Sequence, residues 1–250
     1  MDSPAAPSPG PRRVVAVIQA RMSSTRLPGK VLAPIAGQPM VLRVLTRAAR
    51  IPGVDAAVLA TSDDPSDDHL AAAVVAAGWR VHRGPLEDVR ARFLMAIAAE
   101  GADAAVRITA DCPLICPEVS GRVVAVLRGG GLDYVSNVLH RTWPRGLDTE
   151  AFTAAALAGA AAISDLPRDR EHVTTALWMH PGRVRLCGVH DGIDRSAWRW
   201  TVDTPEDLDL VRRLVAAAGP DAGYADLAAA MAADPALAQV NAAVAQKPVM

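Results

Sequence analysis

Short apolar runs alternate with longer stretches of helical character over residues 14–136, and this alternation constrains the fold more than any other feature. The first run, 14–19, is continuous and rich in β-branched residues, which is typical of a strand buried on both faces. Further strands are expected at 56–61, 80–82, 104–109 and 133–136, with helices at 39–50, 64–77, 86–100 and 117–128. Strands that alternate with helices of this length predict an α/β fold, with a mostly parallel sheet and helices on both faces.

The rhythm loosens after residue 138, where the expected elements are less regular. A loop at 139–150, helices near 152–162 and 168–179, strands at 183–189 and 198–202, and a helix at 204–218 are expected. Four prolines among residues 1–11 exclude a helix or a central strand there. We therefore predict a disordered leader at 1–12, one domain at 13–218, and an Ala-rich helix and tail at 219–250.

The composition excludes several classes of protein. A formal net charge of −1 and an aromatic content of 4% argue against a nucleic-acid partner. Three cysteines provide no disulfide framework and suit a reducing compartment, so we expect a cytoplasmic protein. The apolar stretches are too short to span a membrane, and no membrane partner is expected.

Residues 19–30, which follow the first strand, form the strongest candidate for a ligand-binding loop. In an open α/β sheet, ligands bind beyond the carboxyl ends of the strands. The loop contains two arginines, a lysine and three hydroxyl side chains, which suit a polyphosphate. Lys30 stands out because Lys247 is the only other lysine of the sequence, which otherwise uses arginine. The alternative is a solvated surface loop. The candidates for nucleotide binding here are Gln19, Ala20, Arg21, Ser24, Arg26 and Lys30.

Three other strand ends carry polar side chains. Thr61 and Asp63 follow the second strand and are candidates for contact with a base or ribose. Asp111 follows the strand at 104–109, and Asp203 follows the strand at 198–202. Mg²⁺ usually takes one or two carboxylates together with substrate phosphates, so Asp111 and Asp203 are candidate metal ligands. A turn-forming role for Asp111 and a local role for Asp203 at the next helix start are the alternatives.

Two charged groups lie in the second half of the chain, at 145–150 and 168–174. Arg145, Asp148, Glu150 and His172 either form surface salt bridges or orient a second, anionic substrate. Other chemistries lack their motifs. The sequence has no G-x-S-x-G elbow, and its cysteines lack the histidine partners of a zinc site.

Taken together, residues 13–214 resemble the cytidylyltransferase-like family that includes the spore-coat polysaccharide biosynthesis protein F group. That group is related to the synthetases of CMP-Kdo and CMP-sialic acid. The segments that carry the resemblance are 18–30, 107–114, 134–137, 144–150, 170–174 and 199–207. Cys116 departs from the family, because it stands where an aspartate is frequent.

The resemblance implies a Rossmann-like nucleotidyltransferase fold and a homodimer. By the same carry-over, Arg21, Arg26 and Lys30 grip a triphosphate, while Asp111 and Asp203 hold Mg²⁺. Arg145, Asp148, Glu150 and His172 are placed around the acceptor. Arg21, Lys30, Asp111 and Asp203 are the expected catalytic residues.

The expected reaction moves a nucleoside monophosphate, CMP from CTP, onto an acidic sugar or a similar anionic acceptor, with release of pyrophosphate. It would serve the synthesis of polysaccharide or glycoconjugate precursors. A glycosyltransferase that uses a nucleotide-sugar is one alternative, although Asp111-Cys112-Pro113 holds only one carboxylate of the Asp-x-Asp motif such an enzyme would want. A non-catalytic nucleotide-binding protein is the other alternative.

Overall fold

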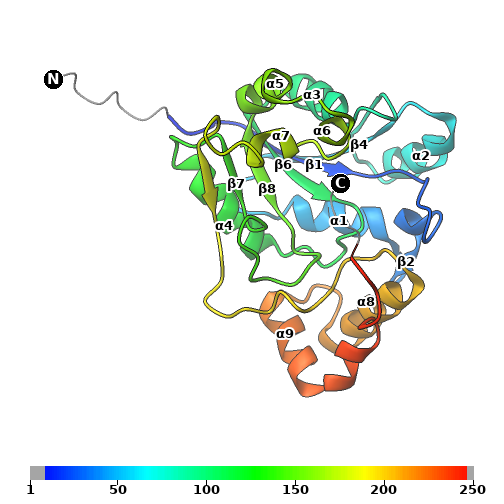
Figure 1. Cartoon of the computed structure of the whole chain (residues 1–250). Helices are drawn as coiled ribbons and strands as arrows, with labels where there is room; N and C mark the ends of the chain where they lie inside the picture. The colour runs from blue at the N-terminus through cyan, green and yellow to red at the C-terminus, as the bar shows by residue number, and fades with distance from the viewer. Residues whose placement is uncertain (1–8, 247–250) are drawn as a thin grey trace.

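The computed structural model describes residues 9–246. They fold around a central seven-stranded sheet of their own, with the strand order β5-β4-β1-β6-β8-β7-β9 (Figure 1). The strands are β1 (Val14–Gln19), β4 (Ala56–Ser62), β5 (Val81–Gly84), β6 (Ala104–Thr109), β7 (Tyr134–Ser136), β8 (Glu150–Thr153) and β9 (Leu186–Gly188). Strand β8 runs antiparallel to both β6 and β7, whereas the other neighbouring pairs are parallel. A separate ribbon pairs β2 (Pro34–Ile35) with β3 (Gln38–Pro39).

Helices cover both faces of this sheet, which confirms the predicted α/β class. The α-helices are α1 (Met40–Ala48), α2 (Asp68–Ala76), α3 (Val89–Ala99), α4 (Pro117–Arg128), α5 (Ala154–Ile163), α6 (Pro167–Glu171), α7 (Thr175–Trp178), α8 (Pro205–Ala218) and α9 (Tyr224–Ala233). The 3-10 helices are η1 (Lys30–Leu32), η2 (Pro65–Asp67) and η3 (Pro235–Gln239). Helices α3, α5, α6 and α7 lie on one side of the sheet, and α1 and α4 lie on the other (Figure 1). Over residues 9–246, no helix combines the length and hydropathy needed to cross a bilayer.

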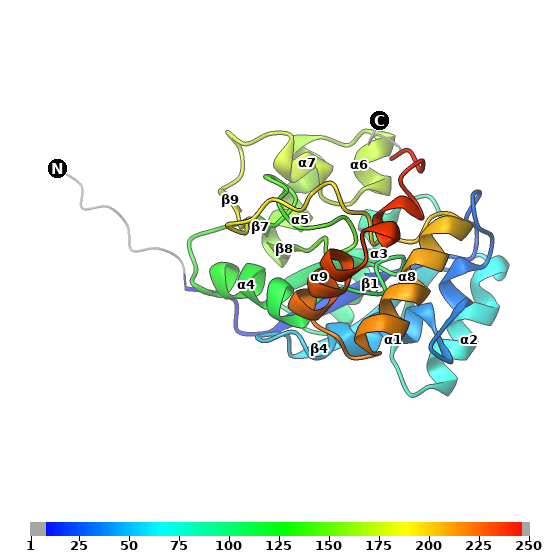
Figure 2. The same ribbon diagram turned by 90° about the horizontal axis from the view of Figure 1, so that it is seen from below.

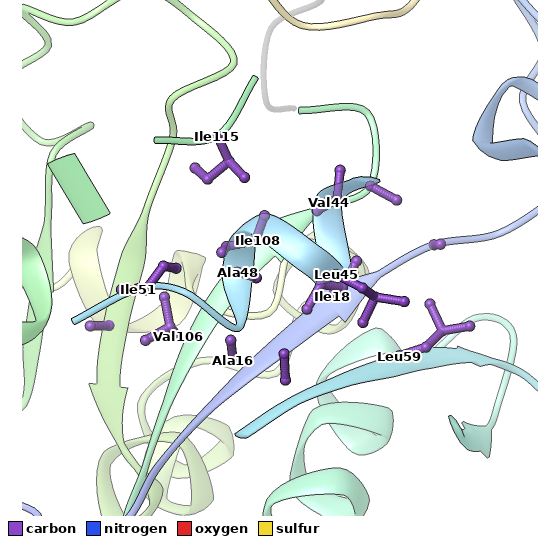
Figure 3. Packing of buried hydrophobic residues seen from close by; sticks show 14 of the residues in the cluster. Ala16, Ile18, Val44, Leu45, Ala48, Ile51, Leu59, Val106, Ile108 and Ile115 are labelled. Atoms are coloured by element: carbon purple, nitrogen blue, oxygen red, sulfur yellow. The ribbon is translucent and has the colours of Figure 1, made fainter. Parts of the chain in front are cut away.

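The central strand β1 is buried on both faces because its side chains alternate between two cores. Ala16 and Ile18 pack with α1 and α4, and Figure 3 shows them beside Leu45 of α1. Val15 and Val17 point to the other face, where they pack with α3, α5 and α7. Burial on both sides explains the uninterrupted apolar run and fixes the carboxyl end of β1 between its neighbours.

A third core joins the C-terminal helices α8 and α9 to the body of the protein. Figure 2 shows these two helices next to each other. Leu210 and Leu214 of α8 pack with Leu227 and Met231 of α9, and buried Trp200 belongs to the same cluster. Helices α9 and η3 therefore share a core with α8. The predicted disordered leader falls largely on residues 1–8, outside the described residues, and the backbone N–H of Arg12 donates to Asp103.

Three sequence predictions of local structure are wrong. Residues 198–202 form no strand, because their extended backbone has a single bridge, from Arg199 to Arg145, and no partner strand. The helix expected near 168–179 is split into α6 and α7, because Val173 between them has a left-handed φ of 62°. Strand β8 occupies the end of a predicted loop and the start of a predicted helix.

Candidate active site

The loop that follows β1 is held in place by a buried carboxylate and a left-handed turn. Asp67 accepts a hydrogen bond of 2.6 Å from the backbone N–H of Met22, which ties the loop to the end of β4. Gly29 has a φ of 69°, a conformation that glycine adopts without steric cost, and it is the residue just before η1. This turn starts η1 at Lys30, whose side chain is buried.

Lys30 connects the ends of two distant segments. Its Nζ donates to Asp111 Oδ2 at 3.0 Å, to Asp203 Oδ1 at 2.8 Å and to the Val202 carbonyl oxygen at 2.7 Å. Burial alone would lower the pKa of Lys30, but the two carboxylates outweigh it and raise the pKa. The ammonium group is therefore charged at neutral pH.

Asp203 is surrounded by positive charge. Besides Lys30, its Oδ2 atom contacts Arg26 Nη2 at 2.8 Å and Arg199 Nη2 at 2.7 Å. Burial would raise the pKa of Asp203, but Lys30, Arg26 and Arg199 together lower it, so the group is an anion. Because one lysine nitrogen contacts both Asp203 and Asp111, the two carboxylates stand close enough for one cation to contact both.

These groups line a cleft of about 380 Å³ at the carboxyl ends of β1 and β6, where a ligand of an open α/β sheet is expected. Six of the eight predicted nucleotide-binding residues and both predicted metal ligands line it: Gln19, Ala20, Arg21, Ser24, Arg26, Lys30, Asp111 and Asp203. We call this the first cleft. Its other cations are Arg21, which lies 3.8 Å from Glu171, and Arg92.

Thr61 and Asp63 are the two predicted nucleotide-binding residues that do not line the first cleft. The Thr61 hydroxyl is buried and donates to Asp67 Oδ2 at 3.0 Å, and Asp63 is exposed. Asp67 also accepts hydrogen bonds from the backbone N–H and the hydroxyl of Ser62. The hydroxyl groups at the end of β4 thus support the loop after β1 by holding Asp67.

All four predicted acceptor-binding residues line a second cleft of about 250 Å³. These residues are Arg145, Asp148, Glu150 and His172. Thr109 and His172 border both clefts, so the two spaces adjoin at these side chains. The structure thereby brings the nucleotide and acceptor candidates into one continuous site.

Glu150 is a buried part of the floor of the second cleft. It accepts hydrogen bonds from Arg107, from Tyr134 Oη at 2.6 Å and from the Thr174 hydroxyl. Burial would lower the pKa of Arg107, but Glu150 raises it, while burial and Glu150 both raise the pKa of Tyr134 well above its ordinary value. Glu150 is thus committed to neighbouring protein groups, which gives it a supporting role.

Arg145 differs from the other arginines of the second cleft. Arg107 is paired with Glu150. Arg141 is paired with Asp148 through two hydrogen bonds, and the one from Nη2 to Oδ2 is 2.8 Å long. Within residues 9–246, the Arg145 guanidinium has no hydrogen-bond or ion-pair partner. Burial is the main cause of a lowered pKa of Arg145; Arg141 and Arg199 add to this effect, and Asp148 opposes it.

His172 is the residue that directly follows α6, and it borders both clefts. Its backbone N–H donates to the Arg168 carbonyl at 2.8 Å. Burial and nearby Arg107 lower the pKa of His172 below 6.5, which favours the neutral imidazole at pH 7. A neutral ring at this position can accept or donate a hydrogen bond next to both clefts.

Arg92 of α3 is the main site residue that sequence reasoning missed. Its side chain is buried and lines the first cleft, yet its Nε and Nη1 atoms have no hydrogen-bond partner among the described residues. Burial lowers its pKa, and Arg21 adds to that effect, while Asp67 opposes it. Because Arg92 lies on a helix and not at a strand end, the sequence did not mark it as a candidate, and only its buried position in the first cleft identifies it.

A comparison with known proteins identifies the family. A protein-family model described as cytidylyltransferase matches residues 15–243, nearly the whole chain. The chain belongs to the cytidylyltransferase family. It is therefore a nucleotidyltransferase enzyme, as the sequence resemblance implied.

Relatives and solved structures agree with this membership. The chain is 34% identical, over 86% of its length and 92% of the relative, to a spore coat polysaccharide biosynthesis protein of Bacillus subtilis (strain 168). It is 31% identical, over 82% of its length and 99% of the relative, to a 3-deoxy-manno-octulosonate cytidylyltransferase of Anaeromyxobacter dehalogenans (strain 2CP-C). A cytidylyltransferase structure from Leptospira borgpetersenii matches with a TM-score of 0.86 at 30% identity, covering 91% of this chain and 97% of that one.

Proposed function

We propose that this enzyme transfers CMP from CTP to a sugar acid or a similar anionic acceptor and releases pyrophosphate. The observation that carries the proposal is the pair of adjoining clefts. One holds Lys30 between Asp111 and Asp203, and the other presents the guanidinium of Arg145, which is unpaired within the described part of the chain. A relative that is named a 3-deoxy-manno-octulosonate cytidylyltransferase supports both CTP and a sugar acid as substrates.

In the proposed step, an acceptor oxygen attacks the α-phosphorus of CTP and the bond to pyrophosphate breaks. Phosphoryl transfer of this kind depends on positioning and on neutralisation of charge. Arg21, Arg26 and Lys30 line the first cleft and supply the positive charge for the triphosphate and the leaving pyrophosphate. Thr109 and His172 stand where the two substrates would meet.

Asp111 and Asp203 fit a divalent metal ion. Both side chains offer carboxylate oxygens, both line the first cleft, and both are within reach of one cation. Mg²⁺ prefers such hard oxygen ligands and completes its shell with phosphates and water. When bound, it would neutralise phosphate charge and polarise the phosphorus for attack.

The acceptor is proposed to be an anion because of the charges in the second cleft. Arg107 and Arg141 are already neutralised by Glu150 and Asp148, which leaves Arg145 to bind a carboxylate. An arginine fork binds a planar carboxylate through two parallel hydrogen bonds. A glycosyltransferase or a non-catalytic nucleotide-binding protein, the alternatives from the sequence, would not need this arrangement, and family membership favours the nucleotidyltransferase.

The first experiment is thermal unfolding with each nucleoside triphosphate, with and without Mg²⁺. A ligand at a hundred times its Kd should stabilise the fold by about 2.7 kcal/mol. We expect stabilisation by CTP that grows with Mg²⁺, followed by pyrophosphate release when 3-deoxy-manno-octulosonate or another sugar acid is added. Stabilisation by nucleotide-sugars alone would contradict the proposal.

A homodimer in the cytoplasm is proposed on the family resemblance. Light scattering on the purified enzyme would measure the mass directly. A particle of 26.1 kDa, the mass of one chain, would contradict the dimer.

A further inference from the structure

The last described residues return to the active site after leaving the third core, which contains α8 and α9. The stretch that follows η3 runs from the C-terminal helices back toward the body of the molecule (Figures 1 and 2). Asn241 is buried on this path, and Gln246 lines the second cleft. We call residues 241–246 the return segment.

The return segment contacts Arg199 at two points. Asn241 Nδ2 donates to the Arg199 carbonyl oxygen at 3.0 Å and to Asp207 Oδ1 at 2.8 Å. Gln246 Oε1 accepts a hydrogen bond from Arg199 Nη1. Both the backbone and the guanidinium of Arg199 are thereby held by this segment.

All three nitrogens of the Arg199 guanidinium are hydrogen-bonded. Nε and Nη2 donate to the two carboxylate oxygens of Asp207 at 2.9 and 3.1 Å. Nη1 donates to Gln246, and Nη2 also donates to Asp203 Oδ2 at 2.7 Å. Because the group is planar and rigid, fixing two of its nitrogens sets the direction of the third. The side of Arg199 that meets Asp203 is therefore oriented by groups that lie outside the first cleft.

Arg199 also touches the segment that bears the proposed acceptor anchor. The Trp198 carbonyl accepts a hydrogen bond from the Arg145 N–H at 3.0 Å, and the Trp200 N–H donates to the Arg145 carbonyl at 2.7 Å. The same short stretch of backbone thus connects the candidate metal ligand Asp203 with Arg145. Gln246 borders the second cleft together with Arg145 and accepts a hydrogen bond from Arg199.

We propose that Gln246 is a positioning residue of this enzyme, which acts through Arg199 to hold the Asp203 carboxylate in the orientation that binds the metal–nucleotide complex. The inference rests on the proposed function, because it assigns a role toward Mg²⁺ and CTP. Groups that orient a metal ligand from outside are typically worth about 10- to 100-fold in metal affinity or activity. The return segment is thereby part of the active site rather than a tail.

The test uses three variants of the full chain and needs no acceptor. Gln246→Leu removes the oxygen that Arg199 binds, and Gln246→Glu keeps an oxygen there. Gln239→Leu makes the same change at an exposed residue on the same part of the chain, outside both clefts, and is the matched control. Thermal unfolding with saturating CTP is followed while Mg²⁺ is titrated.

We expect Gln246→Leu to raise the Mg²⁺ concentration for half-maximal stabilisation about tenfold. Its melting temperature without ligand should equal that of the unaltered enzyme. Gln246→Glu and Gln239→Leu should each reach half-maximal stabilisation at the same Mg²⁺ concentration as the unaltered enzyme.

Three results would overturn the inference. The first is an unchanged Mg²⁺ requirement in Gln246→Leu, even if its ligand-free melting temperature falls, because that marks a structural role only. The second is a Gln246→Glu variant that is as impaired as Gln246→Leu. The third is unaltered enzyme that shows no Mg²⁺-dependent stabilisation by CTP, and only this result also overturns the proposed function.

Discussion

In the first cleft, the buried cation Lys30 contacts two carboxylates, whereas Arg145 of the second cleft forms no ion pair with any carboxylate among residues 9–246. In the first arrangement Lys30 is already paired with two carboxylates, so a ligand of these groups has to compete with internal ion pairs. The second arrangement leaves one positive charge for a ligand to neutralise. We infer that the proposed site separates two tasks: the first cleft holds charge for a polyphosphate and its metal, and the second cleft offers a positive charge to an acid.

The largest effect is expected from removing Lys30 or one of its two carboxylate partners, Asp111 and Asp203. Lys30→Ala and Asp111→Ala should each reduce kcat for pyrophosphate release about 10²-fold or more, the usual cost of removing one fixed electrostatic stabiliser. Lys30→Arg should also be impaired, because a fork does not replace a point charge. Arg213→Ala, which alters only an exposed helical ion pair with Asp209, is the control. Near-normal turnover in Lys30→Ala would remove that residue from the mechanism.

The acceptor side is tested by Arg145→Ala. Arg145 lines the second cleft and has no ion-pair partner among residues 9–246. Its loss should therefore raise the KM for the sugar acid about tenfold or more while the KM for CTP stays the same. Steady-state kinetics with each substrate varied in turn separates the two constants. If the KM for CTP rises equally, the two clefts do not divide the substrates as we infer.

Arg92→Met tests whether Arg92, whose Nε and Nη1 have no hydrogen-bond partner among the described residues, binds the nucleotide in the first cleft. Replacing a buried charge that lacks partners with an apolar side chain should leave the fold as stable or make it more stable. Calorimetry should at the same time show CTP binding weakened about tenfold. A large drop in melting temperature with normal CTP binding would instead assign Arg92 to the core.

The smallest effect concerns pH at the boundary between the clefts. Burial and Arg107 lower the pKa of His172 below 6.5, while Glu171, Glu150 and Asp169 oppose them. As the pH falls below 6.5, the unfolded chain takes up this proton first, so the free energy of unfolding should decrease in that range. NMR titration of the His172 ring gives its pKa directly, and His172→Gln should flatten that part of the stability curve. A midpoint above 6.5 would reverse the sign.

Much of the first cleft could be predicted because its residues are neighbours in sequence. Gln19 to Lys30 form one contiguous loop after a strand that the apolar pattern identifies, and Asp111 follows another such strand. Parallel strands end at one edge of the sheet, so residues at their ends converge. The same rule does not bring Thr61 into the first cleft, because its hydroxyl donates a hydrogen bond to Asp67 of the following 3-10 helix.

The parts that escaped prediction depend on contacts between segments far apart in the chain. Residues 198–202 have the apolar pattern of a strand, but Val202 gives its carbonyl to Lys30 and no strand lies alongside. Strand β8 reverses the direction of the sheet just where Glu150 enters the network with Arg107 and Tyr134. Arg92 and Gln246 carry no local motif, and only packing places them at the clefts.

The contacts of Lys30 join chain positions separated by more than 170 residues, and this has a consequence for synthesis of the protein. A nascent chain that has emerged as far as α7 already carries the loop after β1 and most of the sheet. It still lacks Asp203, so Lys30 has only one of its two carboxylate partners. For the proposed reaction, competence therefore arises only after Asp203 has been synthesised, and chains released from the ribosome before that point would not carry it out.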